Sequence, residues 1–252
     1  FKIDNTTLRK YLKSKIANGD TFLIPQTDKN GIILVSIIFM LNNATQGTFF
    51  KTGHLSSEYK NDIQAKHLWN IMLNLVQGLP QLGLQHTGDL IAFSNMYMDS
   101  FNKSDICMGF STWHTKFREL MNENKNDFYK YILDILKQKQ WVSSAVLNIF
   151  NYLHFDPWIE QLNNQKLLII SPQADKIEQQ IKTIKLQKLY GFDVFANCDF
   201  CFIKFNTWCT DIQTQIVSKL GDFDIALCGC GVYGAIVSNY VYDIGKSAID
   251  IG

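Results

Sequence analysis

The fold is decided by the stretch at residues 222–234, which reads DFDIALCGCGVYG. It contains a short, wholly apolar run at 225–228, followed by glycines at 229, 231 and 234. Apolar residues then recur at helical spacing as far as Gly245, which favours a helix end, and a second apolar run occupies 247–251. The pattern predicts a strand, a glycine turn, a helix and a second strand, which is a βαβ unit with a parallel pair.

The turn between the first strand and the helix is the first candidate binding site. Gly229, Gly231 and Gly234 allow backbone N–H groups to approach a phosphate, and the start of the helix adds a partial positive charge. We therefore predict that this turn, together with Tyr233, binds the phosphates of a ligand. The alternative is that the glycines only permit a tight turn between strand and helix.

The same glycines also have the G-x-G-x-x-G spacing of the dinucleotide-binding fingerprint. Asp250 ends the second apolar run, where an acidic residue of that fingerprint would bind a ribose. Binding of NAD(P) or FAD is therefore an alternative function for the chain.

Composition limits the class of protein. The chain has 252 residues, of which 46% are hydrophobic and 19% charged, as expected for a globular α/β protein with a sizeable core. A net charge of +1 gives no electrostatic reason to expect nucleic acid or an anionic membrane as a partner. We find no signal peptide and no apolar run of about 20 residues, so we expect a cytoplasmic protein without a membrane span.

The six cysteines indicate free thiols rather than a metal or redox site. Cys198 and Cys201 have CxxC spacing, but no second CxxC and no pair of histidines follows at a zinc-binding interval. We expect buried, reduced cysteines, as in the cytoplasm.

The second half of the chain, 151–252, alternates between strand and helix patterns. Strands are predicted at 166–170, 200–204, 225–228 and 247–251, and helices at 175–189, 208–220 and from 235 onwards. This alternation predicts a parallel sheet with helices on both faces, and it places the loops after Ile170 and Cys228 on the same sheet edge. Ser171 and Gln173 are then positioned to donate hydrogen bonds to a phosphate, or alternatively to cap the following helix.

The first half, 1–150, is less regular, and we interpret the whole chain as a single domain. Its pattern predicts a helix at 5–18 capped by a residue among 5–7, and a strand at 21–24 that Pro25 stops. Residues 88–93 form either a strand or the start of a helix that runs to residue 102. A strand is expected at 104–110, and helices at 57–76, 116–122, 126–138 and 141–151.

Two further candidate residues lie in loops of the first half. Asp28 follows the first predicted strand at the sheet edge where α/β proteins bind ligands, although most loop aspartates only stabilise their own turn. Trp113 follows the predicted strand at 104–110 and can stack on a base or sugar, with a place at the rim of the core as the alternative.

Several segments together resemble a known family. Proteins encoded in bacterial polysaccharide gene clusters, and relatives in giant viruses, carry a similar succession of motifs over a region that matches residues 150–252. The matching segments are Asp156-Pro157-Trp158, Leu162 to Pro172, Ile177 with Gln180, Trp208, Asp222 to Gly234, and Ile244 to Gly252.

That family is similar to glycosyltransferases of the GT-D type, which have a Rossmann-like fold. The resemblance implies transfer of a sugar from a nucleoside diphosphate to a glycan or glycoconjugate acceptor. It also implies a loop after the first strand in which an arginine, a glycine and an acidic pair help to hold a divalent metal, Mn²⁺ or Mg²⁺, against the donor diphosphate.

In this chain the corresponding loop, 26–31, contains neither an arginine nor a glutamate. Asp28 is therefore the expected metal ligand, Lys29 can neutralise the diphosphate directly, and a catalytically inactive scaffold becomes a third alternative. Glycosyl transfer also needs a base for the acceptor hydroxyl, for which Asp28 and Asp250 are the candidates.

Overall fold

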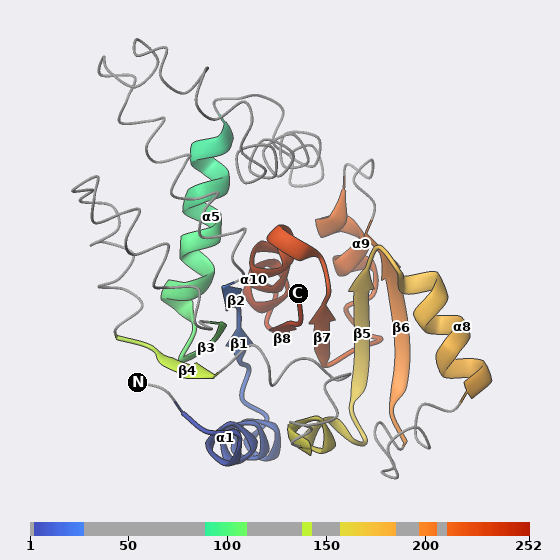
Figure 1. Cartoon of the computed structure of the whole chain (residues 1–252). Helices are drawn as coiled ribbons and strands as arrows, with labels where there is room; N and C mark the ends of the chain where they lie inside the picture. Colours follow the sequence, from blue (N-terminus) through green and yellow to red (C-terminus); the bar gives the residue numbers. More distant parts are fainter. Residues whose placement is uncertain (1–2, 28–88, 110–137, 143–156, 185–196, 206–210) are drawn as a thin grey trace, which may run out of the picture.

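A computed structural model describes residues 3–27, 89–109, 138–142, 157–184, 197–205 and 211–252, which Figure 1 draws as ribbons. The helical elements are α1 (Asn5–Asn18), α5 (Asp89–Lys103), η4 (Pro157–Leu162), α8 (Ala174–Ile184), α9 (Ile212–Ser218), η6 (Gly231–Tyr233) and α10 (Gly234–Asp243). The strands are β1 (Leu23–Ile24), β2 (Gln26–Thr27), β3 (Ile106–Gly109), β4 (Gln140–Val142), β5 (Lys166–Ser171), β6 (Asp199–Lys204), β7 (Ile225–Cys228) and β8 (Ser247–Asp250).

All pairings between these strands are parallel, so the predicted α/β class is confirmed. Five strands form one sheet in the order β1-β8-β7-β5-β6, and three form a second in the order β2-β3-β4. The predicted βαβ unit is also confirmed, because β7 and β8 pair in parallel with α10 between them.

The two sheets are joined through Pro25, which lies between β1 and β2. As predicted, the first strand ends directly before Pro25, because β1 ends at Ile24, but residues 26–27, which were expected to belong to a loop, form the separate strand β2. A proline lacks only its own N–H donor, and the carbonyl of Pro25 still accepts a hydrogen bond from the N–H of Met108 at 2.8 Å. The chain therefore pairs with β8 up to Ile24 and with β3 from Gln26 onwards.

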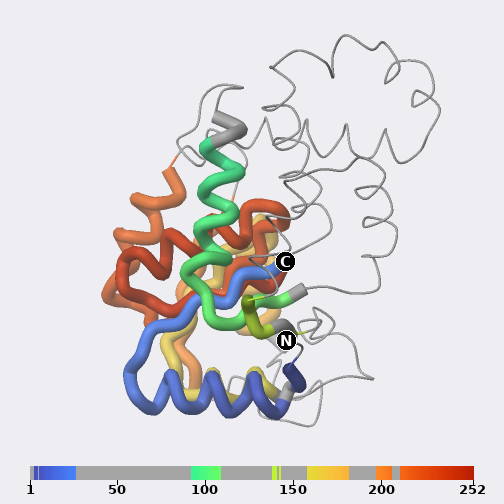
Figure 2. The backbone as a smooth tube through the Cα atoms, turned by 90° about the vertical axis from the view of Figure 1, so that its left-hand side faces the viewer, coloured from blue at the N-terminus to red at the C-terminus, as the bar shows by residue number. Residues whose placement is uncertain are grey.

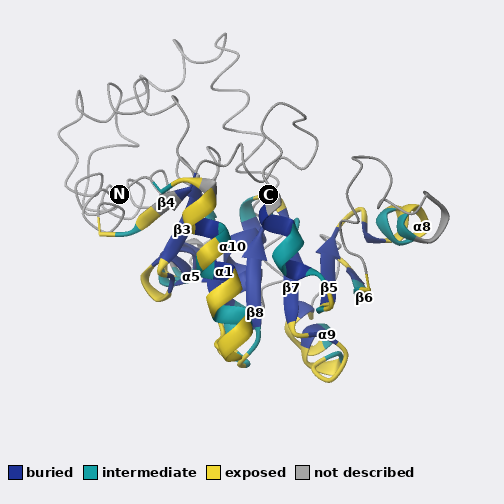
Figure 3. Cartoon of the chain, turned by 90° about the horizontal axis from the view of Figure 1, so that it is seen from below, coloured by how far each residue is buried: buried dark blue, intermediate teal, exposed yellow. Residues whose placement is uncertain are grey.

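Helices cover both faces of the five-stranded sheet, as predicted, because side chains alternate between the faces along each strand. On one face, even-numbered residues of β5 and β7 such as Leu168 and Ala226 form a core with α5, α9 and α10. On the other, odd-numbered residues such as Leu167 and Ile225 form a core with α1 and η4. Figure 2 shows α1 and α5 as separate helices, and Figure 3 shows β5, β7 and β8 as largely buried strands and α1 and α8 as helices with exposed sides.

Other predicted elements were partly right. Residues 140–142 form strand β4, which pairs with β3, and not the start of a helix. Helix α1 is capped by Asp4, one residue before the predicted range, and its carboxylate accepts from the N–H of Thr7 at 2.8 Å. Residues 88–93 were predicted to form either a strand or the start of a helix, and the helix is confirmed, because α5 spans Asp89–Lys103.

The described cysteines are free thiols; Cys107, Cys228 and Cys230 are buried, as predicted, whereas Cys198 and Cys201 are only half-buried. Cys198 packs against the core on the α1 face and Cys201 against the core on the α10 face, so the CxxC pair lies on opposite sides of the sheet. None of the helices within the described ranges is long and apolar enough to cross a membrane.

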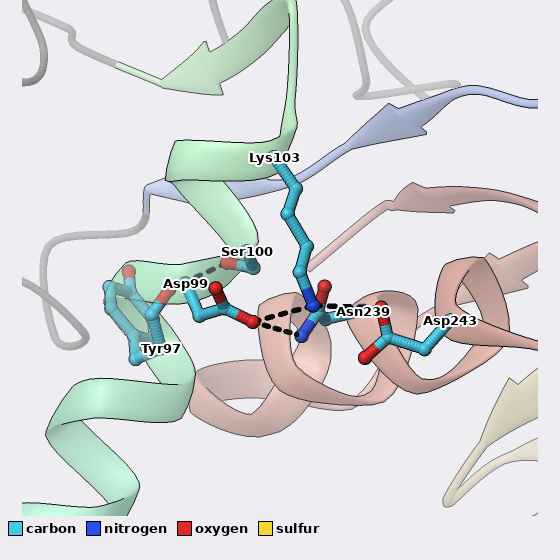
Figure 4. Close-up of polar contacts among 6 residues, drawn as sticks. All are labelled: Tyr97, Asp99, Ser100, Lys103, Asn239 and Asp243. Atoms are coloured by element: carbon cyan, nitrogen blue, oxygen red, sulfur yellow. Dashed lines mark hydrogen bonds and ion pairs between the residues drawn. The ribbon is translucent and has the colours of Figure 1, made fainter.

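Helices α5 and α10 are joined by a polar cluster, here called the α5–α10 clasp, which consists of Asp99, Lys103, Asn239 and Asp243 (Figure 4). The Lys103 Nζ lies 2.7 Å from a carboxylate oxygen of Asp99 and 2.7 Å from one of Asp243. The Asn239 Nδ2 donates to Asp99 at 3.1 Å. The clasp fixes the C-terminal end of α10 to α5.

Candidate functional site

The candidate site lies at the carboxyl edge of the sheet, between β5 and β7. These two strands pair directly, with Ile170 beside Cys228, so the loops that follow them leave from the same edge, as predicted. From β5 the chain crosses to β6 on one side, and from β7 it crosses to β8 on the other. Parallel α/β sheets bind ligands outside the carboxyl ends of two such strands, at the point where the strand order reverses.

The helices that follow β5 and β7 pack on opposite faces of the sheet. Ile177 of α8 packs on the α1 face of the sheet, whereas α10 packs on the opposite face. The loop Ser171–Gln173 and the glycine turn 229–234 therefore flank the reversal point from its two sides.

Some backbone amides of the glycine turn donate hydrogen bonds within the protein, and others, here called uncommitted, have no acceptor among the described residues. The N–H groups of Gly229 and Tyr233 donate to the carbonyls of Ile170 and Cys230 at 2.8 and 3.2 Å. The N–H of Gly234 donates to the carbonyl of Gly231.

By contrast, the amides of Cys230, Gly231 and Val232 have no acceptor among the described residues. Consecutive uncommitted amides at the start of a helical segment form an environment that favours an anion. Cys230 and Val232 were not predicted as site residues. Their contribution comes from the backbone, so their side chains carry no signal in the sequence.

Gly231 is the exposed glycine of the turn, and its φ of +56° is in the left-handed region that L-residues rarely adopt. A Cβ built on Gly231 would meet no heavy atom of the described residues within 4 Å. The backbone at Gly231 is thus open on its outer side.

Gly234 has a different role. It is buried at the start of α10, and a Cβ on it would lie 2.2 Å from Oδ1 of Asp250. Glycine is needed here because α10 packs directly on the carboxylate at the end of β8. The predicted donor contact of Gly234 stays a prediction, since the contact in the structure is with Asp250.

Asp250 is only 2% exposed. Its Oδ2 accepts from the N–H of Gln26 at 3.2 Å and its Oδ1 from the N–H of Gly252 at 3.0 Å. Asp250 therefore connects β8 to β2, whose first residue is Gln26. A role as ribose ligand or catalytic base would require a ligand to reach this buried carboxylate from solvent.

Tyr233 and Gly229 anchor the turn. The Tyr233 ring is 5% exposed and packs against Phe93 and Phe205, with ring centroids 5.9 and 5.6 Å apart. A direct contact between this ring and a donor would require the ring to leave the core. Gly229 packs against the chain end, where a Cβ would lie 3.4 Å from the carbonyl oxygen of Gly252.

The last residue of β5 provides a hydroxyl group at the same edge. Ser171 is 7% exposed, and its Oγ accepts from the N–H of Gln173 at 3.1 Å. The Gln173 side chain is exposed, while its carbonyl accepts from Ile177 at 3.0 Å. Both residues therefore stabilise the start of α8, which is the predicted alternative, and contact with a phosphate stays a prediction.

Two buried thiols lie at the glycine turn, with Cys228 directly before it and Cys230 within it. Burial raises the pKa of Cys228 to about 12 and the pKa of Cys230 well above its usual value. Both remain protonated near neutral pH, so neither supplies a thiolate nucleophile or metal ligand at this site.

Asp28, Lys29 and Trp113 lie outside the described residues. The last described residue before the first two is Thr27, which ends β2 at the carboxyl edge of its sheet. Within the described part of the chain, no three His, Cys, Asp or Glu side chains come together as potential metal ligands.

Comparison of the chain with protein-family models, with curated proteins and with solved structures gives no match.

Proposed function

We propose that this protein is a glycosyltransferase that takes a sugar from a nucleoside-diphosphate donor and transfers it to a glycan or glycoconjugate. The observation that carries the proposal is the set of uncommitted amides at Cys230, Gly231 and Val232, at the point where the strand order reverses. The resemblance of residues 150–252 to GT-D-type glycosyltransferases supports a sugar nucleotide as the ligand and a Rossmann-like, GT-D-like fold.

In this proposal the turn binds the donor diphosphate. Negative charge develops on the leaving diphosphate during glycosyl transfer, and oriented N–H donors stabilise such charge without having to reorganise. The Ser171 hydroxyl lies on the other side of the reversal point and can donate to the same group. The divalent metal at Asp28 and the diphosphate contact of Lys29 rest on the resemblance alone.

The dinucleotide alternative is less well supported. It requires Asp250 to bind the ribose hydroxyls, but this carboxylate is 2% exposed and accepts from two backbone amides. The inactive scaffold remains a distinct outcome, because it needs no bound donor.

A ligand panel separates these functions. We expect a nucleoside diphosphate to raise the melting temperature, and a ligand at 100 times its Kd contributes about 2.7 kcal/mol. For a protein of this size that corresponds to a shift of roughly 5–10 °C. The panel comprises nucleoside diphosphates, their sugar conjugates, NAD⁺, NADP⁺ and FAD, each with and without Mn²⁺.

A matched pair of variants tests the position of the site. Gly231→Asn places a side chain over the uncommitted amides, while asparagine tolerates the left-handed backbone. The control is Gly245→Asn at the other end of α10, where φ is +81° and a Cβ would also meet no described atom within 4 Å. We expect Gly231→Asn alone to abolish the shift. Stabilisation by dinucleotides only, or equal shifts for both variants, would contradict the proposal.

A further inference from the structure

Lys204 stands out among the described lysines by its place on the sheet. It is the last residue of β6, whereas Lys166 opens β5 and Lys246 directly precedes β8. Because the strands are parallel, Lys204 lies at the carboxyl edge beside the candidate site, and the other two lie at the opposite edge.

Pairing places Lys204 next to the loop that follows β5. Lys204 pairs with Ser171, and the N–H of Phe205 donates to the Ser171 carbonyl at 3.0 Å. Phe200 and Phe202 pack on the α1 face, and alternation along β6 places the Lys204 side chain on that face too. The same alternation along β5 places Ser171 on this face. The ammonium group and the Ser171 hydroxyl therefore share one side of the sheet, on strands about 4.8 Å apart.

The present partner of Lys204 is a carboxylate that is easily exchanged. Lys204 forms an ion pair with Asp175, and the two side chains are 57% and 66% exposed. Exposed ion pairs contribute little to stability, so their exchange costs little. Asp175 lies in the first turn of α8, where the helix dipole stabilises a negative charge even without the lysine.

From these contacts we infer that Lys204 is a phosphate-binding residue of the candidate site. In the free protein Asp175 holds its ammonium group, and a bound diphosphate takes over the lysine while Asp175 stays with the N-terminus of α8. The inference rests on the proposed function, since it adds a mobile cation to the fixed amides of the glycine turn.

Titration calorimetry with inorganic pyrophosphate tests this directly, because pyrophosphate carries the diphosphate without a base or sugar. We expect Lys204→Met to weaken binding roughly tenfold, as expected for one charge-assisted hydrogen bond. Asp175→Asn removes the competing carboxylate and should strengthen binding about twofold. Lys166→Met, which removes the same charge from the opposite edge of the neighbouring strand, serves as the control and should bind like the wild type.

Salt provides a second measurement on the same proteins. Each phosphate–lysine contact makes binding more sensitive to ionic strength. The plot of log Kd against log salt concentration should therefore be shallower for Lys204→Met than for the wild type or Lys166→Met.

The outcomes distinguish this inference from the proposed function. If the wild type binds pyrophosphate, Gly231→Asn weakens that binding and Lys204→Met behaves like Lys166→Met, the role of Lys204 is wrong and the glycine-turn site stands. If the wild type binds neither pyrophosphate nor any nucleoside diphosphate, both are wrong. The expected order, with Asp175→Asn tightest and Lys204→Met weakest, supports the inference.

Discussion

The two ends of helix α10 are held by different kinds of contact. At its C-terminal end, Lys103 is bound by the carboxylates of Asp99 and Asp243 in the α5–α10 clasp (Figure 4). At its N-terminal end, close packing of Gly234 on Asp250 fixes the helix, and the preceding turn keeps amides uncommitted. Side-chain charges thus stabilise one end, while the other combines tight packing with backbone donors that have no acceptor among the described residues. In the proposed function, the ligand binds at the N-terminal end.

Two lysines illustrate the same contrast. Burial lowers the pKa of Lys103, but hydrogen bonds to Asp243 and Asp99 outweigh it, and the net effect is a raised pKa. Among the described residues, Lys204 has one carboxylate partner, Asp175, and its side chain is 57% exposed against 33% for Lys103. A lysine held by two carboxylates joins helices, whereas a lysine with one exposed partner can move to a ligand.

The largest expected effect comes from Gly234→Ala. The new methyl group would overlap the Asp250 carboxylate, whose nearest oxygen is 2.2 Å away and whose carbon is 2.6 Å away. Either α10 moves or Asp250 loses its bonds to the backbone, and we expect a loss of about 3 kcal/mol in the free energy of unfolding. Urea denaturation measures it.

The control for this substitution is Gly221→Ala, where a Cβ would meet no described atom within 4 Å and φ is not in the left-handed region. It should leave stability nearly unchanged. A Gly234→Ala protein as stable as Gly221→Ala would show that close packing does not hold the N-terminal end of α10.

A smaller effect is expected when the clasp is broken. Lys103→Met leaves the carboxylates of Asp99 and Asp243 without their shared cation, and we expect a loss of about 1 kcal/mol because the network is partly exposed. The difference should shrink in about 1 M salt, where the Debye length falls to roughly 3 Å. Lys166→Met is the control for loss of a lysine outside the clasp.

The raised pKa of Lys103 sets the pH dependence of the clasp. Its contribution is fully present below the ordinary lysine pKa of 10.5 and is lost as pH rises through the higher folded value. The stability difference between wild type and Lys103→Met should therefore be constant near neutral pH and decline only in strong alkali. A difference that grew with pH would contradict the assignment.

The strands around the site could be predicted because their signals are local. β5 and β7 are continuous apolar runs bounded by polar or glycine residues, as buried parallel strands require. Strand β4 could not be predicted in this way. It is three residues long, and its pairing with β3 connects residues more than 30 positions apart, which no local pattern encodes.

The role of the glycine turn in binding stays a prediction, and the sequence indicated only part of its geometry. The glycine spacing located the turn, but it could not show which amides are occupied, because the bond from Gly229 to Ile170 depends on the neighbouring strand. Nor could it show that Asp250 is buried under Gly234. The sequence also could not show that Lys204 lies beside the candidate site, because this position depends on pairing with Ser171, a residue 33 positions earlier in the chain.

The last comparison is between the two glycines with left-handed backbone that flank α10. Gly231 and Gly245 have φ values of +56° and +81°, and both face open space among the described residues. Gly231→Ala and Gly245→Ala should therefore each destabilise the protein by about 1 kcal/mol, since alanine is strained in this region while asparagine is not. Urea denaturation should give equal losses in the free energy of unfolding, and only the change at 231 should weaken pyrophosphate binding. This result would show that the two turns differ in ligand binding and not in backbone strain. If Gly245→Ala weakened binding as much as Gly231→Ala, the uncommitted amides would not be the anion site, because strain at the far end of α10 would suffice to explain the loss.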